Sequence, residues 1–361
     1  MAAAGFGEVG ACPAPKQHLA SLGMSWEVIV VDDGPYPCGM AGLRQADAVE
    51  RRARAIARAH GGFWCGGSTG PKYGSLEQSA PPILRLSPGS RPAVPPLAAA
   101  AAPPPGDFAL TPDTQPLRQA PPDLASPVNW EELSHAYGTA ADLPARFSGM
   151  LLSDRDWGEE IGELAGCLLH QGSCYPSTGP ALTVLARLIT ADALTAARRR
   201  DVYLLLLTGA DCWRDDLILD ADCAAALARP ARPGAWAGEV REAVGGIVPP
   251  LLGRWATEPP GNQVTLAALA AVFPRHGEGL CDLIAALAAK QARTQAGAYA
   301  HLACLLIAGD SVAALTAARD IYGWHDGLTA FDIDNELVEP GMRAERVLSD
   351  AVTATVAVVR P

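Results

Sequence analysis

Two histidines are the side chains best suited to proton transfer or metal binding, because a neutral imidazole offers a lone pair near physiological pH. His135 and His170 each stand beside a turn-like sequence, Ala136-Tyr137-Gly138 and Gln171-Gly172. A histidine at the C-terminus of a helix is favoured by the helix dipole and can bond the last carbonyls. We therefore expect capping rather than catalysis, with hydrogen bonds from tyrosines across the junction.

Cys167 and Cys174 lie close to His170 in the chain. Zinc sites usually carry two short ligand pairs, and this C-x2-H pair has no second half. We therefore expect both cysteines to pack in the core. No pattern in the chain predicts a metal ion or any other cofactor.

A glycine-rich stretch, Gly66-Gly67-Ser68-Thr69-Gly70-Pro71-Lys72, invites comparison with a phosphate-binding loop. Such a loop needs four residues between its glycines and a Ser or Thr directly after its Lys. Here Tyr73 follows Lys72, and Pro71 removes a backbone donor. We interpret the stretch as an ordinary loop.

A dense acidic segment, HDGLTAFDIDNELVE, begins at His325. Alternate carboxylates could bind Ca²⁺ or Mg²⁺, but the central glycine and terminal glutamate of an EF-hand are missing. Solvated charge is the ordinary interpretation, and attraction of a basic partner is the functional one. The candidate binding residues of the chain are His135, Tyr137, His170, Gln171, Tyr175, Trp213, Asp326, Asp332, Asp334 and Glu336.

Charge divides the chain into two parts. Residues 1–126 hold 10 basic and 10 acidic residues, and residues 127–361 hold 18 and 29, so the net charge of −11 belongs to the second part. This balance argues against binding of nucleic acid or an anionic membrane, which both need clustered Lys and Arg. The sequence also lacks an export signal, a long uncharged apolar run and a CxxC pair. We therefore expect a cytoplasmic protein with reduced thiols.

The first part of the chain contains little that could build a core. We expect residues 1–23 to be disordered, residues 24–78 to form a small α/β element, and residues 79–128 to be a Pro/Ala-rich linker. The linker interpretation rests on fourteen prolines, which hold the backbone in extended conformations.

From residue 129 to about 330 the pattern changes to apolar helices with short breaks. We predict five helix pairs, whose second helices begin near residues 180, 215, 249, 278 and 311. The pairs are Glu159–His170 with Pro180–Ile189, Arg198–Leu207 with Asp215–Ala228, Ala237–Ile247 with Pro249–Trp255, Gln263–Phe273 with Gly277–Ala289, and Arg293–Ala308 with Ser311–Ile321. A period of about 30–35 residues in helix pairs is typical of a solenoid. Residues 331–361 are assigned to a C-terminal extension.

The stretch EVREAVGGIVPPLLGRW and the residues that follow it to Gly309 resemble tandem HEAT repeats of the bacterial type. The segments NWEELSHAYGTAADLP and HQGSCY are similar to largely uncharacterised HEAT-repeat proteins of high-GC bacteria. This resemblance implies a mainly α-helical fold, a HEAT-like α-solenoid. The Arg that is often found in the first helix of a repeat is replaced by Thr265.

Extended concave surfaces favour binding, and the sequence assembles no nucleophile, base and orienting group. We therefore expect a protein-binding scaffold whose concave face holds a protein or peptide, with immunity-like inhibition of a basic partner as one form. The alternative is an enzyme on a HEAT scaffold, of the bilin-lyase or DNA-glycosylase kind, which the resemblance alone suggests.

Overall fold

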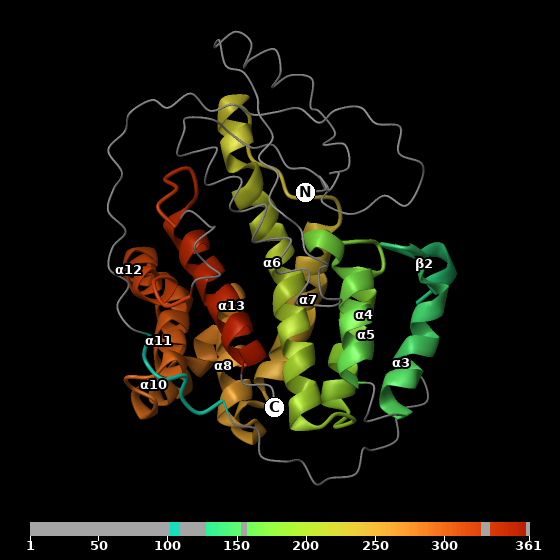
Figure 1. The fold of residues 1–361 in the computed structure, drawn as a ribbon, viewed down its shortest axis with the longest axis horizontal. Helices are drawn as coiled ribbons and strands as arrows, with labels where there is room; N and C mark the ends of the chain where they lie inside the picture. Colours follow the sequence, from blue (N-terminus) through green and yellow to red (C-terminus); the bar gives the residue numbers. More distant parts are fainter. Residues whose placement is uncertain (1–101, 109–127, 153–156, 326–332, 359–361) are drawn as a thin grey trace, which may run out of the picture.

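The structure is a computed structural model that describes residues 102–108, 128–152, 157–325 and 333–358. The expectations for residues 1–23 and 24–78, for most of the linker, and for Asp326 and Asp332 lie outside these ranges. The described chain is mainly helical, which confirms the expected fold class at that level (Figure 1).

The first described elements after the linker are short. A two-stranded antiparallel sheet pairs Ser134 with Thr139 and His135 with Gly138. The elements up to α5 are η1 (Trp130–Glu132), β1 (Ser134–His135), β2 (Gly138–Thr139), η2 (Ala140–Asp142), α3 (Leu143–Leu152), α4 (Trp157–Leu168), η3 (His170–Gly172) and α5 (Thr178–Thr190).

Longer helices make up the rest of the body. These elements are α6 (Ala196–Ala226), α7 (Ala237–Leu252), η4 (Trp255–Thr257), α8 (Pro260–Val272), α9 (Pro274–Gly277), η5 (Glu278–Leu280), α10 (Cys281–Lys290), α11 (Gln295–Ile307), α12 (Ser311–Tyr322) and α13 (Pro340–Val358). Several lie close to the predicted helices, and α12 differs from its prediction by one residue. None of the helices in the described ranges combines the length and apolar character that a membrane crossing requires.

Two of the predicted breaks are wrong, because α6 and α7 are continuous helices. The prediction divided α6 before Asp215, yet it runs without interruption over 31 residues. It divided α7 at Pro249, yet that helix includes Pro249 and Pro250. These prolines lie in the last turn, where each removes one hydrogen bond to a carbonyl of the preceding turn, and the helix ends soon after them, at Leu252.

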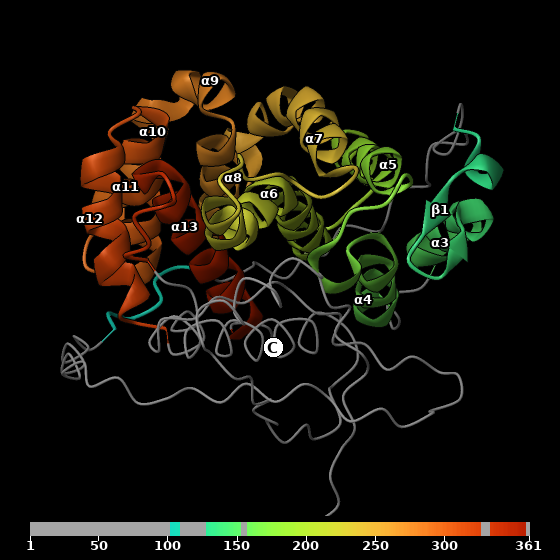
Figure 2. The ribbon, with the colours of Figure 1, turned by 90° about the horizontal axis from the view of Figure 1, so that it is seen from above.

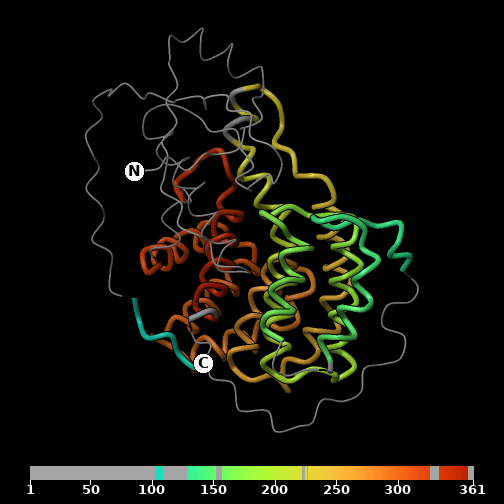
Figure 3. The backbone as a smooth tube through the Cα atoms, turned by 45° about the vertical axis from the view of Figure 1, so that its right-hand side comes forward, coloured from blue at the N-terminus to red at the C-terminus, as the bar shows by residue number. Residues whose placement is uncertain are grey.

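The core centres on α8, which is buried over nearly its whole length. It contacts α6, α7, α11 and α13, so apolar side chains are required all round it. In Figure 2, α5 and α7 lie on one side of α6 and α8, and α13 lies on the other. The strands β1 and β2 and helix α12 lie at opposite ends of the molecule, and the last turns of α6 extend beyond the neighbouring helices (Figures 1 and 3).

The last helix, α13, comes from the segment that the sequence analysis assigned to a C-terminal extension. It packs against α6, α8, α11 and α12 and contributes buried residues such as Val347 and Val352 to the core. The side of α6, α8 and α11 that faces α13 is therefore covered by the chain itself.

Candidate functional site

A proline-rich segment, residues 103–108, lies against the start of α11 and runs beside α10 and α11 in Figure 1. The main-chain N–H groups of Gln295 and Ala296 donate to the carbonyls of Pro104 (2.9 Å) and Pro105 (3.0 Å). The Gln295 side chain donates to the carbonyl of Pro103 (3.0 Å). Because the first N–H groups of a helix have no partner within that helix, the segment supplies the acceptors that α11 lacks.

The segment then turns at Gly106 and Asp107. The Asp107 N–H donates to Gln291 Oε1 (2.8 Å), and the Phe108 N–H donates to the Gly106 carbonyl (3.1 Å). Gly106 has a φ of +92°, and a Cβ there would lie 2.6 Å from Thr294 Oγ1. Glycine is required at this position because other residues rarely adopt this positive φ and because a Cβ would clash with Thr294.

Phe108 ends the described segment as a buried aromatic side chain with 1% of its surface exposed. Its ring centroid lies 6.4 Å from that of Tyr299 on α11. On the other side, a Cβ at Gly261 of α8 would lie 3.1 Å from the Phe108 carbonyl oxygen. Burial of a phenylalanine side chain stabilises such a contact by about 2–3 kcal/mol. We name the receiving residues the docking site: Gly261, Gln291, Thr294, Gln295, Ala296 and Tyr299.

A buried polar network fixes the Gln295 side chain. The Tyr299 hydroxyl donates to Gln295 Oε1 (3.0 Å), so the amide nitrogen of Gln295 is the atom that faces Pro103. Thr355 of α13 and His325 Nε2 lie 2.8 and 2.7 Å from the same hydroxyl. Burial raises the pKa of Tyr299, which therefore stays a neutral donor. The docking site is thus held in shape by α11 and α13 together.

The sequence analysis missed this site, because it treated residues 79–128 only as a linker. One signal was present, since Phe108 is the only aromatic residue in that stretch. A single apolar ring after a proline run suggests a point of attachment, but the receiving residues come from α8, α10 and α11. Their proximity depends on the fold and not on local sequence.

The structure places His135 in β1 with both ring nitrogens engaged. Nδ1 accepts from the Tyr137 main-chain N–H (3.1 Å), so Nε2 carries the proton and donates to Asp142 Oδ1 (3.0 Å). The expectation of a C-terminal helix cap is therefore wrong for His135, which links β1 to the end of η2. This arrangement leaves no lone pair on the ring for metal binding or proton transfer.

Tyr137 and His170 are brought together, as the sequence analysis expected of a tyrosine at this junction. The Tyr137 hydroxyl lies 3.0 Å from His170 Nδ1, and the two rings pack edge to face. Burial lowers the pKa of His170, which favours its neutral form. His170 follows the C-terminus of α4, but its ring contacts Tyr137 instead of a carbonyl. Gln171 and Tyr175 follow it as half-buried residues.

The remaining described candidates lie elsewhere. Trp213 is on α6, where the Arg241 guanidinium lies 5.1 Å from its ring centre. Asp334 forms an exposed ion pair with Arg319 of α12 (2.7 Å), and Glu336 is exposed. The eight candidates that the structure describes therefore do not form one site. Cys167 and Cys174 are buried, as expected.

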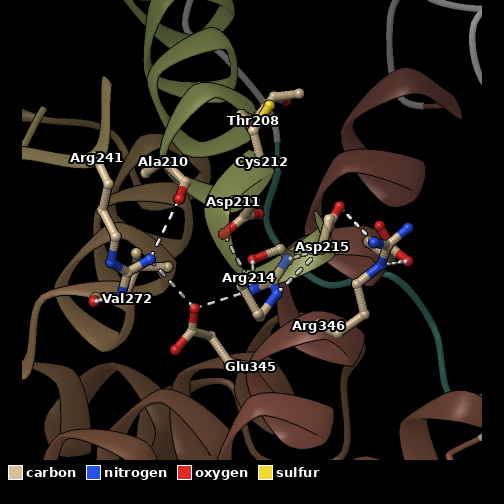
Figure 4. A network of polar contacts seen from close by, with 12 residues as sticks. Thr208, Ala210, Asp211, Cys212, Arg214, Asp215, Arg241, Val272, Glu345 and Arg346 are labelled. Atoms are coloured by element: carbon tan, nitrogen blue, oxygen red, sulfur yellow. Dashed lines mark hydrogen bonds and ion pairs between the residues drawn. The ribbon is translucent and has the colours of Figure 1, made fainter. Parts of the chain in front are cut away.

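A second polar cluster joins α6 to α13 (Figure 4). Arg214 is 1% exposed and pairs with Asp211 (3.0 Å), Asp215 (2.9 Å) and Glu345 (3.1 Å). Arg346 of α13 pairs with Asp215 as well. Within the described ranges, no three His, Cys, Asp or Glu side chains are grouped as metal ligands.

The carboxylates of this cluster differ in their protonation. Burial raises the pKa of Asp211 to about 7 and also raises that of Glu345. Burial acts on Asp215 in the same direction, but Arg346 and Arg214 outweigh it and hold its pKa below the ordinary value. Arg241 of α7 also lies 3.9 Å from Glu345. Because the closer pairs join α6 to α13, we interpret the cluster as a contact that fixes α13.

Comparison of the chain with family models, curated proteins and solved structures found no match.

Proposed function

We propose that this protein is a protein-binding scaffold of HEAT-like helical hairpins and that its docking site binds an extended, proline-rich peptide of a partner protein. The hairpin architecture is supported by the packing of alternate helices, α5 on α7 and α6 on α8. The observation that carries the binding proposal is the way in which residues 103–108 are held. Three carbonyls and one N–H of the segment bond to the site, and one ring is buried.

Recognition of this type suits a peptide ligand. Main-chain hydrogen bonds provide affinity for an extended chain, and a pocket for one side chain adds specificity. A proline run already has the extended shape before binding, so little conformational entropy is lost on docking.

The segment that occupies the site belongs to the same chain and therefore competes with a partner. A tethered ligand acts at an effective concentration on the order of 1 mM when its linker spans the sites. A partner peptide must therefore bind strongly enough to displace a segment at this effective concentration, or it must meet a molecule whose own segment has already been released. We propose that the segment keeps the site closed until a partner of the same pattern displaces it.

The expected class of partner, a protein or peptide, is the same as in the sequence analysis, but its binding site is no longer placed on the concave face of a solenoid. The inner face of α6, α8 and α11 is covered by α13, so the binding surface is placed at the start of α11 instead. The net charge of −11 over residues 127–361 favours a partner that carries basic residues around its peptide. Immunity-like inhibition of a basic partner is the form of the proposal that this charge supports.

Release of the segment in the full-length chain tests the proposal. Phe108→Ala removes the buried ring, and a fluorescent peptide with the sequence of residues 101–109 then reports binding by anisotropy. We expect the variant to bind this peptide at least about tenfold more tightly than the wild type, because the competing segment no longer fills the site. Equal binding by both proteins, or no binding by a folded variant, would contradict the proposal.

A matched pair of glycine substitutions separates release from general destabilisation. Gly106→Ala combines an unfavourable φ of +92° with a clash against Thr294, whereas Gly309→Ala has a φ of +73° and no atom within 4 Å. Both carry a similar backbone cost of about 1–2 kcal/mol. Only Gly106→Ala should increase binding of the labelled peptide, and an equal increase in Gly309→Ala would show that release is not the cause.

A further inference from the structure

We infer that the docking site recognises a defined pattern in its partner, namely a proline-rich extended stretch followed by glycine, any residue except proline, and phenylalanine. This inference rests on the proposed function and adds the chemistry of the ligand to it. Each position of the pattern follows from a separate contact of the segment.

The first three positions are recognised through the backbone. Pro103, Pro104 and Pro105 contribute carbonyl oxygens, and the site bonds to none of their nitrogens. The side chains of Pro104 and Pro105 are exposed. Proline therefore serves to hold the extended shape, and another residue can replace one proline at a small cost.

The fourth position must be glycine. A Cβ at Gly106 would lie 2.6 Å from Thr294 Oγ1 and 2.7 Å from Gln291 Oε1. Neither atom can withdraw freely, because Thr294 caps α11 by accepting from the Gly297 N–H (3.1 Å) and Gln291 accepts from Asp107. The positive φ adds a cost of about 1–2 kcal/mol for any other residue.

The fifth position accepts any side chain but needs an N–H. Asp107 is exposed, while its N–H donates to Gln291 Oε1 at 2.8 Å. Proline has no N–H and would leave this acceptor without its partner. The site therefore excludes proline directly after the glycine, although it accepts prolines before it.

The sixth position needs a large apolar ring. Phe108 is 1% exposed, and its ring centroid lies 6.4 Å from that of Tyr299, while its main chain lies against Gly261 of α8. A smaller side chain leaves a cavity and loses the ring contact with Tyr299. The spacing between glycine and phenylalanine is fixed by the tight turn that joins the Phe108 N–H to the Gly106 carbonyl.

Single-residue variants of the nine-residue peptide test this pattern on full-length Phe108→Ala protein. We expect alanine at the position of Gly106, proline at that of Asp107, and alanine at that of Phe108 each to weaken binding by about tenfold or more. Alanine at the position of Asp107 or of Pro104 should change the affinity by less than about threefold.

The outcomes separate the inference from the proposed function. If the parent peptide binds but the glycine variant binds equally well, the pattern is wrong and the binding function stands. A larger loss at Pro104 than at Gly106 would show that proline side chains are recognised, and would also overturn the pattern. If the parent peptide fails to bind the folded Phe108→Ala protein, the proposed function fails and the pattern fails with it.

Discussion

At the scale of single residues, the two histidines that seemed most reactive in the sequence have different structural roles. His135 is buried and uses both ring nitrogens, whereas His170 is half-buried and makes its bond to the exposed Tyr137. Residue type alone identified both. Their roles depend on partners that are brought close only by the fold, through the small sheet and η2.

This difference predicts unequal costs on substitution. His135→Ala removes a buried ring together with its two hydrogen bonds, to the Tyr137 N–H and to Asp142, and should lower the free energy of unfolding by about 1–3 kcal/mol. His170→Ala removes one partly exposed contact and should cost less than about 1 kcal/mol. Urea denaturation followed by circular dichroism measures both. A larger loss in His170→Ala than in His135→Ala would contradict the roles assigned here.

At the scale of helices, the sequence predicted which segments are helical better than where they end. The predicted break in α6 fell between Leu207 and Asp215, but the helix continues there and packs on α5, where a Cβ at Gly209 would lie 2.5 Å from Leu182 Cδ1. That contact joins residues from two helices, so local patterns cannot reveal it. The prediction was accurate where a helix end depends on local residues. One example is the start of α12, which the Asp310 side chain caps.

The contact between α6 and α13 predicts a dependence of stability on pH. Asp211 has a pKa of about 7 in the folded protein, above its ordinary value of 3.8, so the folded state holds a proton that the unfolded state loses. The free energy of unfolding should therefore fall by about 2–3 kcal/mol between pH 5 and pH 8 through this group. Burial also raises the pKa of Asp216 and of Glu345, which adds to the same trend.

Asp211→Asn should reduce this fall, because an amide does not ionise. Asp215→Asn is the matched control, since the pKa of Asp215 is lowered and its charge is present throughout this pH range. That variant should lose stability at every pH from 5 to 8. Because burial raises the pKa of Asp211 more than the Asp215 charge does, Asp215→Asn should flatten the slope less than Asp211→Asn. Denaturation midpoints at four pH values measure both. An unchanged slope in Asp211→Asn would rule out Asp211 as the titrating group.

At the scale of the whole molecule, the chain covers its own surfaces with segments from both ends of the described region. Helix α13 packs on α6, α8 and α11, and the segment at residues 103–108 fills the docking site on α8, α10 and α11. Composition distinguished a proline-rich stretch from a helical body. It could not show that the two meet, because the contact joins Phe108 to residues more than 150 positions away.

Hydrogen exchange at the start of α11 tests the central claim most directly. The first amides of a helix normally lack intrahelical partners, so protection of Gln295 and Ala296 must come from the carbonyls of Pro104 and Pro105. The Gly297 amide, which bonds to Thr294 within the cap, is the internal reference. In Phe108→Ala the first two amides should exchange about tenfold faster than in the wild type, and the added peptide should restore their protection. Unchanged exchange in the variant, or exchange that the peptide does not slow, would contradict the account.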